Sequence, residues 1–204
     1  MSARQRFPER PVGLYDPSYE HDACGVAFVA RLDSVQSHET VRRALTAVGN
    51  LEHRGAAGAD PNTGDGAGML LQMPDAFFRA VVGDELPPLG RYGVGVCFLP
   101  SDDAAAGRLE QLIAATIEAE GQRVVCWRDV PVDDTPIGET ARAFQPRIKQ
   151  VVVAASPELA ADQDAFERKL YVIRRVCELA AGAELAFPSF SSRTLIYKGM
   201  LSAP

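Results

Sequence analysis

Apolar and polar positions follow two different periods along the chain, and each period predicts one kind of secondary structure. In three stretches the apolar residues recur every three or four positions, which places them on one face of a helix. Between these stretches lie short apolar runs, several of them stopped by proline or glycine, as is typical of strands. The chain therefore combines helices and strands throughout its length.

Three amphipathic helices are predicted. Ser37 is a suitable N-cap for the first helix and Ser101 for the second, which Gly121 ends. The apolar faces consist of Val41, Ala44, Leu45, Val48 and Leu51 in the first helix, Leu109, Leu112, Ile113, Thr116 and Ile117 in the second, and Phe166, Leu170, Ile173 and Cys177 in the third. Each helix thus has one face with which it can cover a sheet.

Six apolar runs predict strands. They are residues 24–32, "GMLLQMP" at 68–74, "RYGVGVCFLP" at 91–100, "RVVCW" at 123–127, "QVVVAAS" at 150–156 and "RTLIYKG" at 193–199. The first run, from Cys24 to Leu32, suits a strand that is buried on both faces. Some strands follow one another directly and others follow helices, so helices layered on mixed or antiparallel sheet fit better than a doubly wound parallel sheet.

Residues 1–23 differ from the rest of the chain. They carry Pro8, Pro11 and Pro17, alternating charges and few branched aliphatic residues, which predicts an irregular leader. The leader has no apolar segment of the kind that an export signal needs. We therefore expect a cytoplasmic protein with reduced thiols.

Composition and charge exclude several classes of partner. The 204 residues are 47% hydrophobic, which suffices for one sizeable core. The formal net charge is -6, and no run of Lys or Arg exceeds two residues, so a nucleic-acid partner is not expected. No apolar stretch approaches the roughly 18 residues of a membrane span. The four cysteines form no C-x-x-C pair, which disfavours a zinc site.

Cys24 stands where the leader meets the first apolar run, whereas Cys97, Cys126 and Cys177 are predicted to be small core residues. A cysteine nucleophile acts as a thiolate, so its site must supply a base or lower the thiol pKa from about 8.5. His21, three residues upstream, is one candidate base. The other is the α-amino group that cleavage before Cys24 would free, with a pKa of about 7.7–8.0.

Three blocks of sequence resemble a known family. "LYDPSYEHDACGVAFVA", "LEHRGAAGADPNTGDGAGMLLQMPDAFF" and "SRTLIYKGML" are similar to the amino-terminal glutaminase domain of the glutamate synthase large subunit. The resemblance implies a class II glutamine amidotransferase with the α+β fold of the N-terminal-nucleophile hydrolases, an αββα sandwich with antiparallel sheets. Residues 1–23 would be the leader, or propeptide, and residues 24–204 the first part of the amidotransferase domain, incomplete in this chain.

The resemblance also implies a reaction. After removal of the leader, the Cys24 thiol would attack the side-chain amide of glutamine, its own α-amino group would pass the proton to the departing ammonia, and water would hydrolyse the thioester. In the family the ammonia aminates 2-oxoglutarate at a flavin site of the full-length protein, which holds FMN and an iron–sulfur cluster; no cofactor is expected in this chain. The implied partners are glutamine, the remainder of the large subunit, and an electron-donating small subunit or ferredoxin.

Arg54 is the second residue that the resemblance assigns. The "LEHRG" block matches an element whose arginine helps to organise the glutamine pocket, and Arg54 would have that supporting role. On the residues alone, Arg54 and Gly55 also fit the end of a helix. The following "DPNTGDGAG" lacks the lysine of a phosphate-binding loop and the spacing of a calcium loop, so we expect a structural turn near the thiol.

Two elements of the family are absent. The family stabilises the oxyanion with an Asn-Gly pair, but Asn50 precedes Leu51 and Asn62 precedes Thr63. The arginine that binds the substrate carboxylate should be followed by an aromatic residue, Ser and Thr, whereas Arg193 is followed by Thr194. We therefore expect that the isolated 204 residues do not hydrolyse glutamine, and that uncovered apolar surface makes them associate.

Two other interpretations remain open. A standalone N-terminal-nucleophile thiol amidase would have to stabilise its oxyanion with backbone N–H groups alone. A non-catalytic interaction fragment would keep residues 1–23 and would bury Cys24 as an ordinary apolar side chain.

Overall fold

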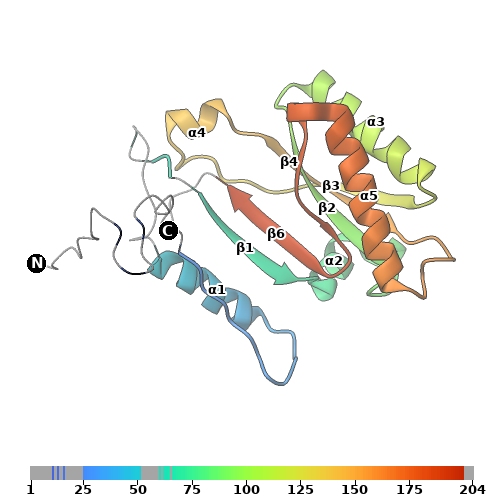
Figure 1. The fold of residues 1–204 in the computed structure, drawn as a ribbon, viewed down its shortest axis with the longest axis horizontal. Helices are drawn as coiled ribbons and strands as arrows, with labels where there is room; N and C mark the ends of the chain where they lie inside the picture. Colours follow the sequence, from blue (N-terminus) through green and yellow to red (C-terminus); the bar gives the residue numbers. More distant parts are fainter. Residues whose placement is uncertain are drawn as a thin grey trace, which may run out of the picture.

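Two antiparallel sheets form the centre of the computed structural model, which describes residues 11, 13, 16, 25–51, 60, 62–64 and 66–199 (Figure 1). The larger sheet has the order β3-β4-β2-β5 and the smaller one consists of β1 and β6. Their bounds are β1 Ala67–Gln72, β2 Tyr92–Leu99, β3 Arg123–Asp129, β4 Arg147–Ala154, β5 Ala186–Ser191 and β6 Thr194–Gly199. All strand pairs in the described part of the chain are antiparallel, as the resemblance implies, whereas the order of the elements left mixed sheet open as well.

Helices lie on both sides of the stacked sheets. Their bounds are α1 His38–Asn50, α2 Asp75–Val82, α3 Asp103–Ala119, α4 Glu139–Ala143 and α5 Gln163–Ala181, with 3₁₀ turns at Gly83–Glu85 and Gly182–Glu184. Helices α3 and α5 pack on one face of the larger sheet, and α1 lies against β1 (Figure 1). The order of layers is therefore helices, larger sheet, smaller sheet, helix.

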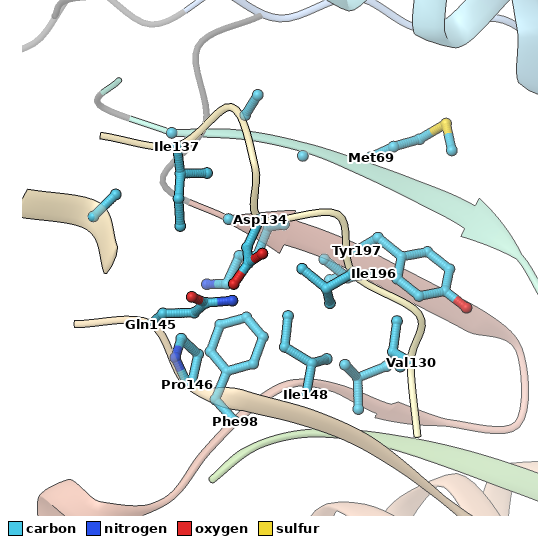
Figure 2. A pocket seen from close by; sticks show the side chains of 18 of the residues that line it. Met69, Phe98, Val130, Asp134, Ile137, Gln145, Pro146, Ile148, Ile196 and Tyr197 are labelled. Atoms are coloured by element: carbon cyan, nitrogen blue, oxygen red, sulfur yellow. The ribbon is translucent and has the colours of Figure 1, made fainter. Parts of the chain in front are cut away.

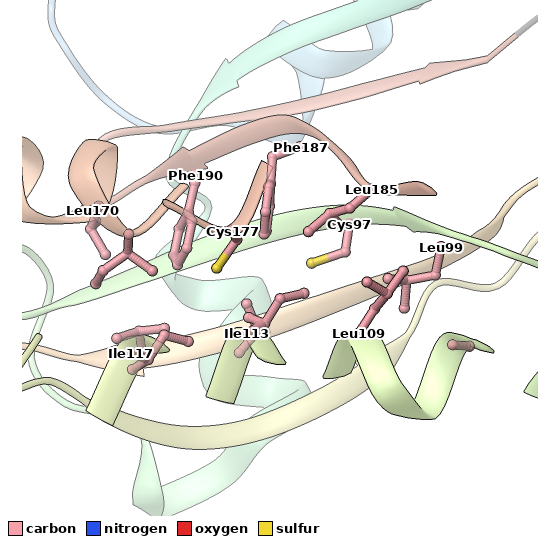
Figure 3. Close-up of a cluster of buried hydrophobic side chains, with 14 of the residues drawn as sticks. Cys97, Leu99, Leu109, Ile113, Ile117, Leu170, Cys177, Leu185, Phe187 and Phe190 are labelled. Carbon is pink, nitrogen blue, oxygen red and sulfur yellow. The ribbon is translucent and has the colours of Figure 1, made fainter. Parts of the chain in front are cut away.

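The outer core fills the space between the larger sheet and its two helices (Figure 3). Val151 and Val153 of β4 contribute to it. Most side chains of the predicted apolar faces are buried there: Leu109, Ile113, Thr116 and Ile117 in α3, and Phe166, Leu170, Ile173 and Cys177 in α5, while Leu112 is only partly buried. The sheet approaches α5 so closely that a Cβ atom on Gly93 would lie 2.5 Å from Leu170 Cδ1. Glycine is required there by packing.

The inner core joins the two sheets. Successive strand residues point to opposite faces, so Tyr92, Val94 and Val96 of β2 face the smaller sheet. They pack with Leu195 of β6 and with Phe78 of α2. The short turn between β5 and β6 leads the chain from the edge of the larger sheet into the smaller one.

The smaller sheet pairs segments that are distant in the sequence. Strand β1 begins at Ala67, whose partner is Gly199, and ends at Gln72, whose partner is Thr194. The turn before β6 is held by Glu167 of α5, which accepts hydrogen bonds from the Ser191 hydroxyl and the Ser192 N–H. The smaller sheet can therefore form only when β1 and β6, which are more than 100 residues apart in the sequence, come together.

Helix termini follow the sequence with one correction. The Ser37 hydroxyl accepts a hydrogen bond from Glu39 N at 3.2 Å, so the predicted cap of α1 is confirmed. The cap of α3 is Asp102 rather than Ser101, because the carboxylate one residue later reaches Ala105 N at 2.8 Å. Gly121 ends α3 with a φ of 74°, and the next N–H, that of Gln122, donates to Ile117 O.

The prediction of a buried strand from Cys24 to Leu32 is wrong for its described part. Gly25–Leu32 is in neither sheet, and Val26, Phe28 and Leu32 are 87–103% exposed. An apolar run becomes a strand only where another strand offers backbone hydrogen bonds, and none of the described strands pairs with this segment. Cys24 itself lies outside the described residues.

Candidate functional site

A groove of about 1110 Å³ opens between the two sheets (Figure 2). It is somewhat larger than the roughly 300–1,000 Å³ of most small-molecule sites. The apolar side chains that line it include Phe98 and Ile148 of the larger sheet, Met69 and Ile196 of the smaller sheet, Leu45 and Val48 of α1, and Val130, Ile137 and Pro146 of the segment between β3 and β4. The groove adjoins the inner core, because Val96, Ile148 and Tyr197 belong to both.

A few polar groups interrupt this lining. Asp134 and Gln145 face the groove from the segment between β3 and β4 (Figure 2). Asp134 is held from outside by Arg142, whose Nη2 donates to the Asp134 carbonyl oxygen at 2.7 Å and whose Nη1 lies 3.3 Å from its carboxylate. A mainly apolar hollow with few polar groups is typical of a surface that another segment or ligand covers.

A buried hydrogen-bond chain crosses between the sheets beside the groove. Gln150 of β4 is fully buried, and its Nε2 donates to the Tyr197 hydroxyl of β6 at 2.8 Å. Its Oε1 accepts from Arg128 Nη1 at 2.8 Å. Because a buried amide without partners is costly, this chain favours one relative placement of the two sheets.

The "DPNTGDGAG" segment forms a turn in its described part, and the turn docks on α4. The Thr63 N–H donates to Asp60 O, and the Asp60 carboxylate accepts from Thr63 Oγ1 at 2.7 Å and from Thr140 N at 3.1 Å. The hydrogen bond from Thr63 is the main reason that the pKa of Asp60 lies below its usual range. The sequence predicts the turn but not the partner, since Thr140 lies far along the chain.

The three described cysteines are unsuited to nucleophilic attack. Burial raises the pKa of the Cys97 thiol above its usual range and does the same for Cys126 and Cys177. Cys97 and Cys177 lie in the outer core, fully buried among apolar side chains (Figure 3). Their assignment to the core is confirmed, and Cys126 is half-buried beside the inner core. These thiols remain protonated at neutral pH.

The residues to which the sequence assigns chemistry, Cys24, His21 and Arg54, lie outside the described part of the chain. The structure therefore does not test whether these three side chains lie close to one another. The groove and the docked turn are what sequence reasoning missed, and no local signal marks either, because both depend on contacts between distant segments.

The described residues form neither a metal-binding cluster nor a membrane-spanning helix. These residues bring no three His, Cys, Asp or Glu side chains together in a way that could hold a metal ion. Within the same part of the chain, no helix combines the length and the apolarity that crossing a membrane requires.

Comparison with known proteins gives consistent matches. The family model "Glutamine amidotransferases class-II" matches residues 24–204. The glutamate synthase [NADPH] large chain of Bacillus subtilis (strain 168) is 46% identical over 194 residues, which is 93% of this chain and 13% of that protein. Ferredoxin-dependent glutamate synthase 1 of Arabidopsis thaliana is 42% identical over 209 residues, 98% of this chain and 13% of that protein. The chain thus spans about 13% of the length of these relatives.

Proposed function

Because the chain belongs to the class-II glutamine amidotransferases, we propose that it is the segment of a glutamate synthase in which glutamine is hydrolysed. Its layers are those of the N-terminal-nucleophile hydrolases, an α+β sandwich with antiparallel sheets, as predicted. One observation supports a particular nucleophile: the family match begins at residue 24, which is Cys24.

Cys24 is the proposed nucleophile, and residues 1–23 are the proposed leader. Removal of the leader would leave Cys24 as the first residue, and its α-amino group, with a pKa of about 7.7–8.0, would be the base beside the thiol. The thiolate attacks the glutamine amide carbon, the amine returns the proton to the leaving ammonia, and water releases glutamate from the thioester. Burial raises the pKa of the Cys97 and Cys177 thiols, and of the half-buried Cys126 thiol, which supports the choice of Cys24.

Arg54 is proposed to support the glutamine pocket. The oxyanion and the substrate carboxylate need further donors, and this chain has neither an Asn-Gly pair nor an arginine followed by an aromatic residue, Ser and Thr. We therefore propose that the 204 residues alone do not turn over glutamine.

The remaining steps are proposed for the longer protein. Ammonia would be used there to aminate 2-oxoglutarate, with electrons from a small subunit or from ferredoxin. Iron–sulfur clusters are held by several cysteine thiolates, and the described residues bring no three His, Cys, Asp or Glu side chains together that could hold a metal ion. The FMN and the cluster are proposed to bind in other parts of the longer protein, and the location is proposed to be the cytoplasm.

The test is the amino-terminal sequence and intact mass of the full-length protein, measured beside Cys24→Ser. We expect a wild-type chain that begins at Cys24 and hydrolyses glutamine, and a variant whose hydrolysis falls at least about a thousandfold. Synthesis of glutamate from added ammonia should survive in the variant, which shows that it is folded. A wild-type chain that keeps Met1 and still hydrolyses glutamine contradicts the proposed base. A chain that keeps Met1 and is inactive favours the non-catalytic interpretation.

A further inference from the structure

Helix α5 carries a second set of apolar side chains on the side that faces away from the larger sheet. One face of α5 is buried in the outer core, yet Tyr171, Val172, Val176 and Leu179 are 41–73% exposed. A single exposed apolar side chain is ordinary on a protein surface, but these four lie within about three turns of one helix. We call them the outward stripe of α5. Such a patch is typical of a surface that another segment covers.

Helix α3 lies beside α5 on the same face of the larger sheet and has no such stripe (Figure 1). Its exposed positions include Arg108, Gln111, Ala115 and Glu118, which are polar or small. The structure describes every residue of α3, and none of its large apolar side chains is exposed. Because the two helices share one layer and one sheet, packing on the sheet does not account for the outward stripe of α5.

The spacing of the outward stripe indicates that a helix covers it. Val172, Val176 and Leu179 follow one another at intervals of four and three residues. This is the spacing by which one helix packs along another, with its apolar side chains between those of its partner. An amphipathic helix laid along α5 would therefore bury all three side chains.

Basic residues border the outward stripe on one side. Arg168 and Arg175 are exposed and seven residues apart, so they lie on the same side of α5. Arg168 forms no ion pair with any described residue, and Arg175 shares the Glu178 carboxylate with Arg174. This edge therefore has an excess of positive charge, although the chain as a whole carries a net charge of -6. A helix that complements it has acidic residues along the facing edge.

The same charges argue against a second copy of this chain as the occupant. In an antiparallel pair of α5 helices, Arg168 and Arg175 would face the arginines of the other copy. In a parallel pair they would lie opposite Ile173 and Ala180, which carry no charge. Neither arrangement neutralises the arginines, and like charges in contact oppose association.

We propose that the outward stripe of α5 docks an amphipathic helix with an acidic edge, supplied by the part of the longer protein that follows this chain. The chain spans about 13% of the length of its relatives, so a protein of their length has most of its residues available to supply this helix. Tethering within one protein gives the helix a high effective concentration, which suits a stripe of few side chains. The inference rests on the proposal that the chain is a segment of a glutamate synthase, but not on the identity of its nucleophile.

The first experiment measures whether the outward stripe is covered in the full-length protein. Leu179→Cys places a thiol on the stripe, and Ala115→Cys places one on the exposed side of α3 as a matched control. Both variants are treated with N-ethylmaleimide, the modified peptides are identified by mass spectrometry, and each rate is divided by the rate in urea. We expect the thiol of Leu179→Cys to react at least about tenfold more slowly than that of Ala115→Cys, because a covered thiol is inaccessible. Equal rates would overturn the proposal.

The second experiment identifies what covers the outward stripe. Arg168→Lys keeps the positive charge and supplies an amine that a carbodiimide can join to a carboxylate in contact with it. We expect the introduced lysine to be linked to an acidic segment beyond residue 204 in a product that migrates as a single chain. A product that joins two chains would overturn the proposed occupant, whether the second chain is another copy or a small subunit. The absence of any link at the introduced lysine would overturn it as well.

Neither experiment uses glutamine, so the outcomes separate this inference from the proposed function. If the wild type hydrolyses glutamine and the thiol of Leu179→Cys reacts as fast as the control, the docking surface is overturned and the proposed function stands. If the stripe is protected but the wild type never hydrolyses glutamine, the proposed function fails and the docking surface stands.

Discussion

The two faces of the larger sheet are covered to different extents. On the outer face, α3 and α5 bury a continuous core in which Ile113, Leu170 and Ile173 have no exposed surface. On the inner face, the smaller sheet packs against only part of the strands, and the groove opens between the two sheets where that packing ends. Helix α1 has an apolar stripe like those of α3 and α5, yet none of its residues is buried and Leu45 is 50% exposed. An amphipathic pattern therefore predicts which face is apolar, but not whether that face is covered.

The largest expected difference in stability is between a truncation in the outer core and a truncation beside the groove. Leu170→Ala empties a site in the outer core and should lower the free energy of unfolding by about 2–5 kcal/mol. Leu45→Ala removes a half-exposed side chain beside the groove and should cost less than about 1 kcal/mol. Urea denaturation of both variants measures the difference. Equal losses would mean that the groove side is as well packed as the outer core.

A pair of glycine substitutions sharpens the picture of the outer core. A Cβ atom on Gly93 would lie 2.5 Å from Leu170 Cδ1, so Gly93→Ala should destabilise the fold by about 1–3 kcal/mol. A Cβ atom on Gly107, within α3, would meet nothing within 4 Å. Gly107→Ala should therefore stabilise by about 0.5–1 kcal/mol through helix propensity. The midpoint of thermal unfolding should fall for Gly93→Ala and rise for Gly107→Ala. A Gly93→Ala variant that unfolds at or above the wild-type temperature would refute the tight fit of β2 against α5.

The smallest expected effect is the pH dependence of the cap on α4. Hydrogen bonding from Thr63 lowers the folded-state pKa of Asp60, so its contribution is complete above the ordinary carboxyl pKa of about 3.9 and is lost as the pH falls through the lower folded value. Amide exchange at Thr140, which donates to Asp60, should lose protection below about pH 4 before exchange at Val152 in the larger sheet does. Simultaneous loss at both positions would mean that the cap does not open separately.

Much of this fold follows from local pattern, and the misses have local causes. The stripes of α3 and α5 are long enough to define both the helix and its buried face. Helices α2 and α4 were not predicted, because eight and five residues give too little periodicity. Strand β5 was missed because it contains Pro188, which argues against a strand unless the residue lies at an edge, and β5 is an edge strand.

In the candidate site, too, local sequence predicts some features, while others depend on contacts between distant segments. Residues next to one another in the sequence revealed the turn at Asp60 and the family resemblance around Cys24 and Arg54. The cap on α4 could not be predicted, because it joins Thr63 to Ala141 and leaves no mark on either segment alone. The roles of Cys24 and Arg54 remain predictions, since both residues lie outside the described part of the chain.

The pairing of β1 with β6 has a consequence for biosynthesis. Ala67 leaves the ribosome long before its partner Gly199, and at roughly 5–20 residues per second the interval is on the order of ten seconds. Throughout that interval β1 lacks its partner β6, and the backbone N–H and C=O groups that will pair with β6 are open to other chains. The larger sheet needs only residues up to Ser191. The larger sheet can therefore assemble before β6 is available, and β1 can pack against it without a strand partner. Because β1 is the strand left unpaired, aggregation of the nascent chain should be most sensitive to substitutions in β1.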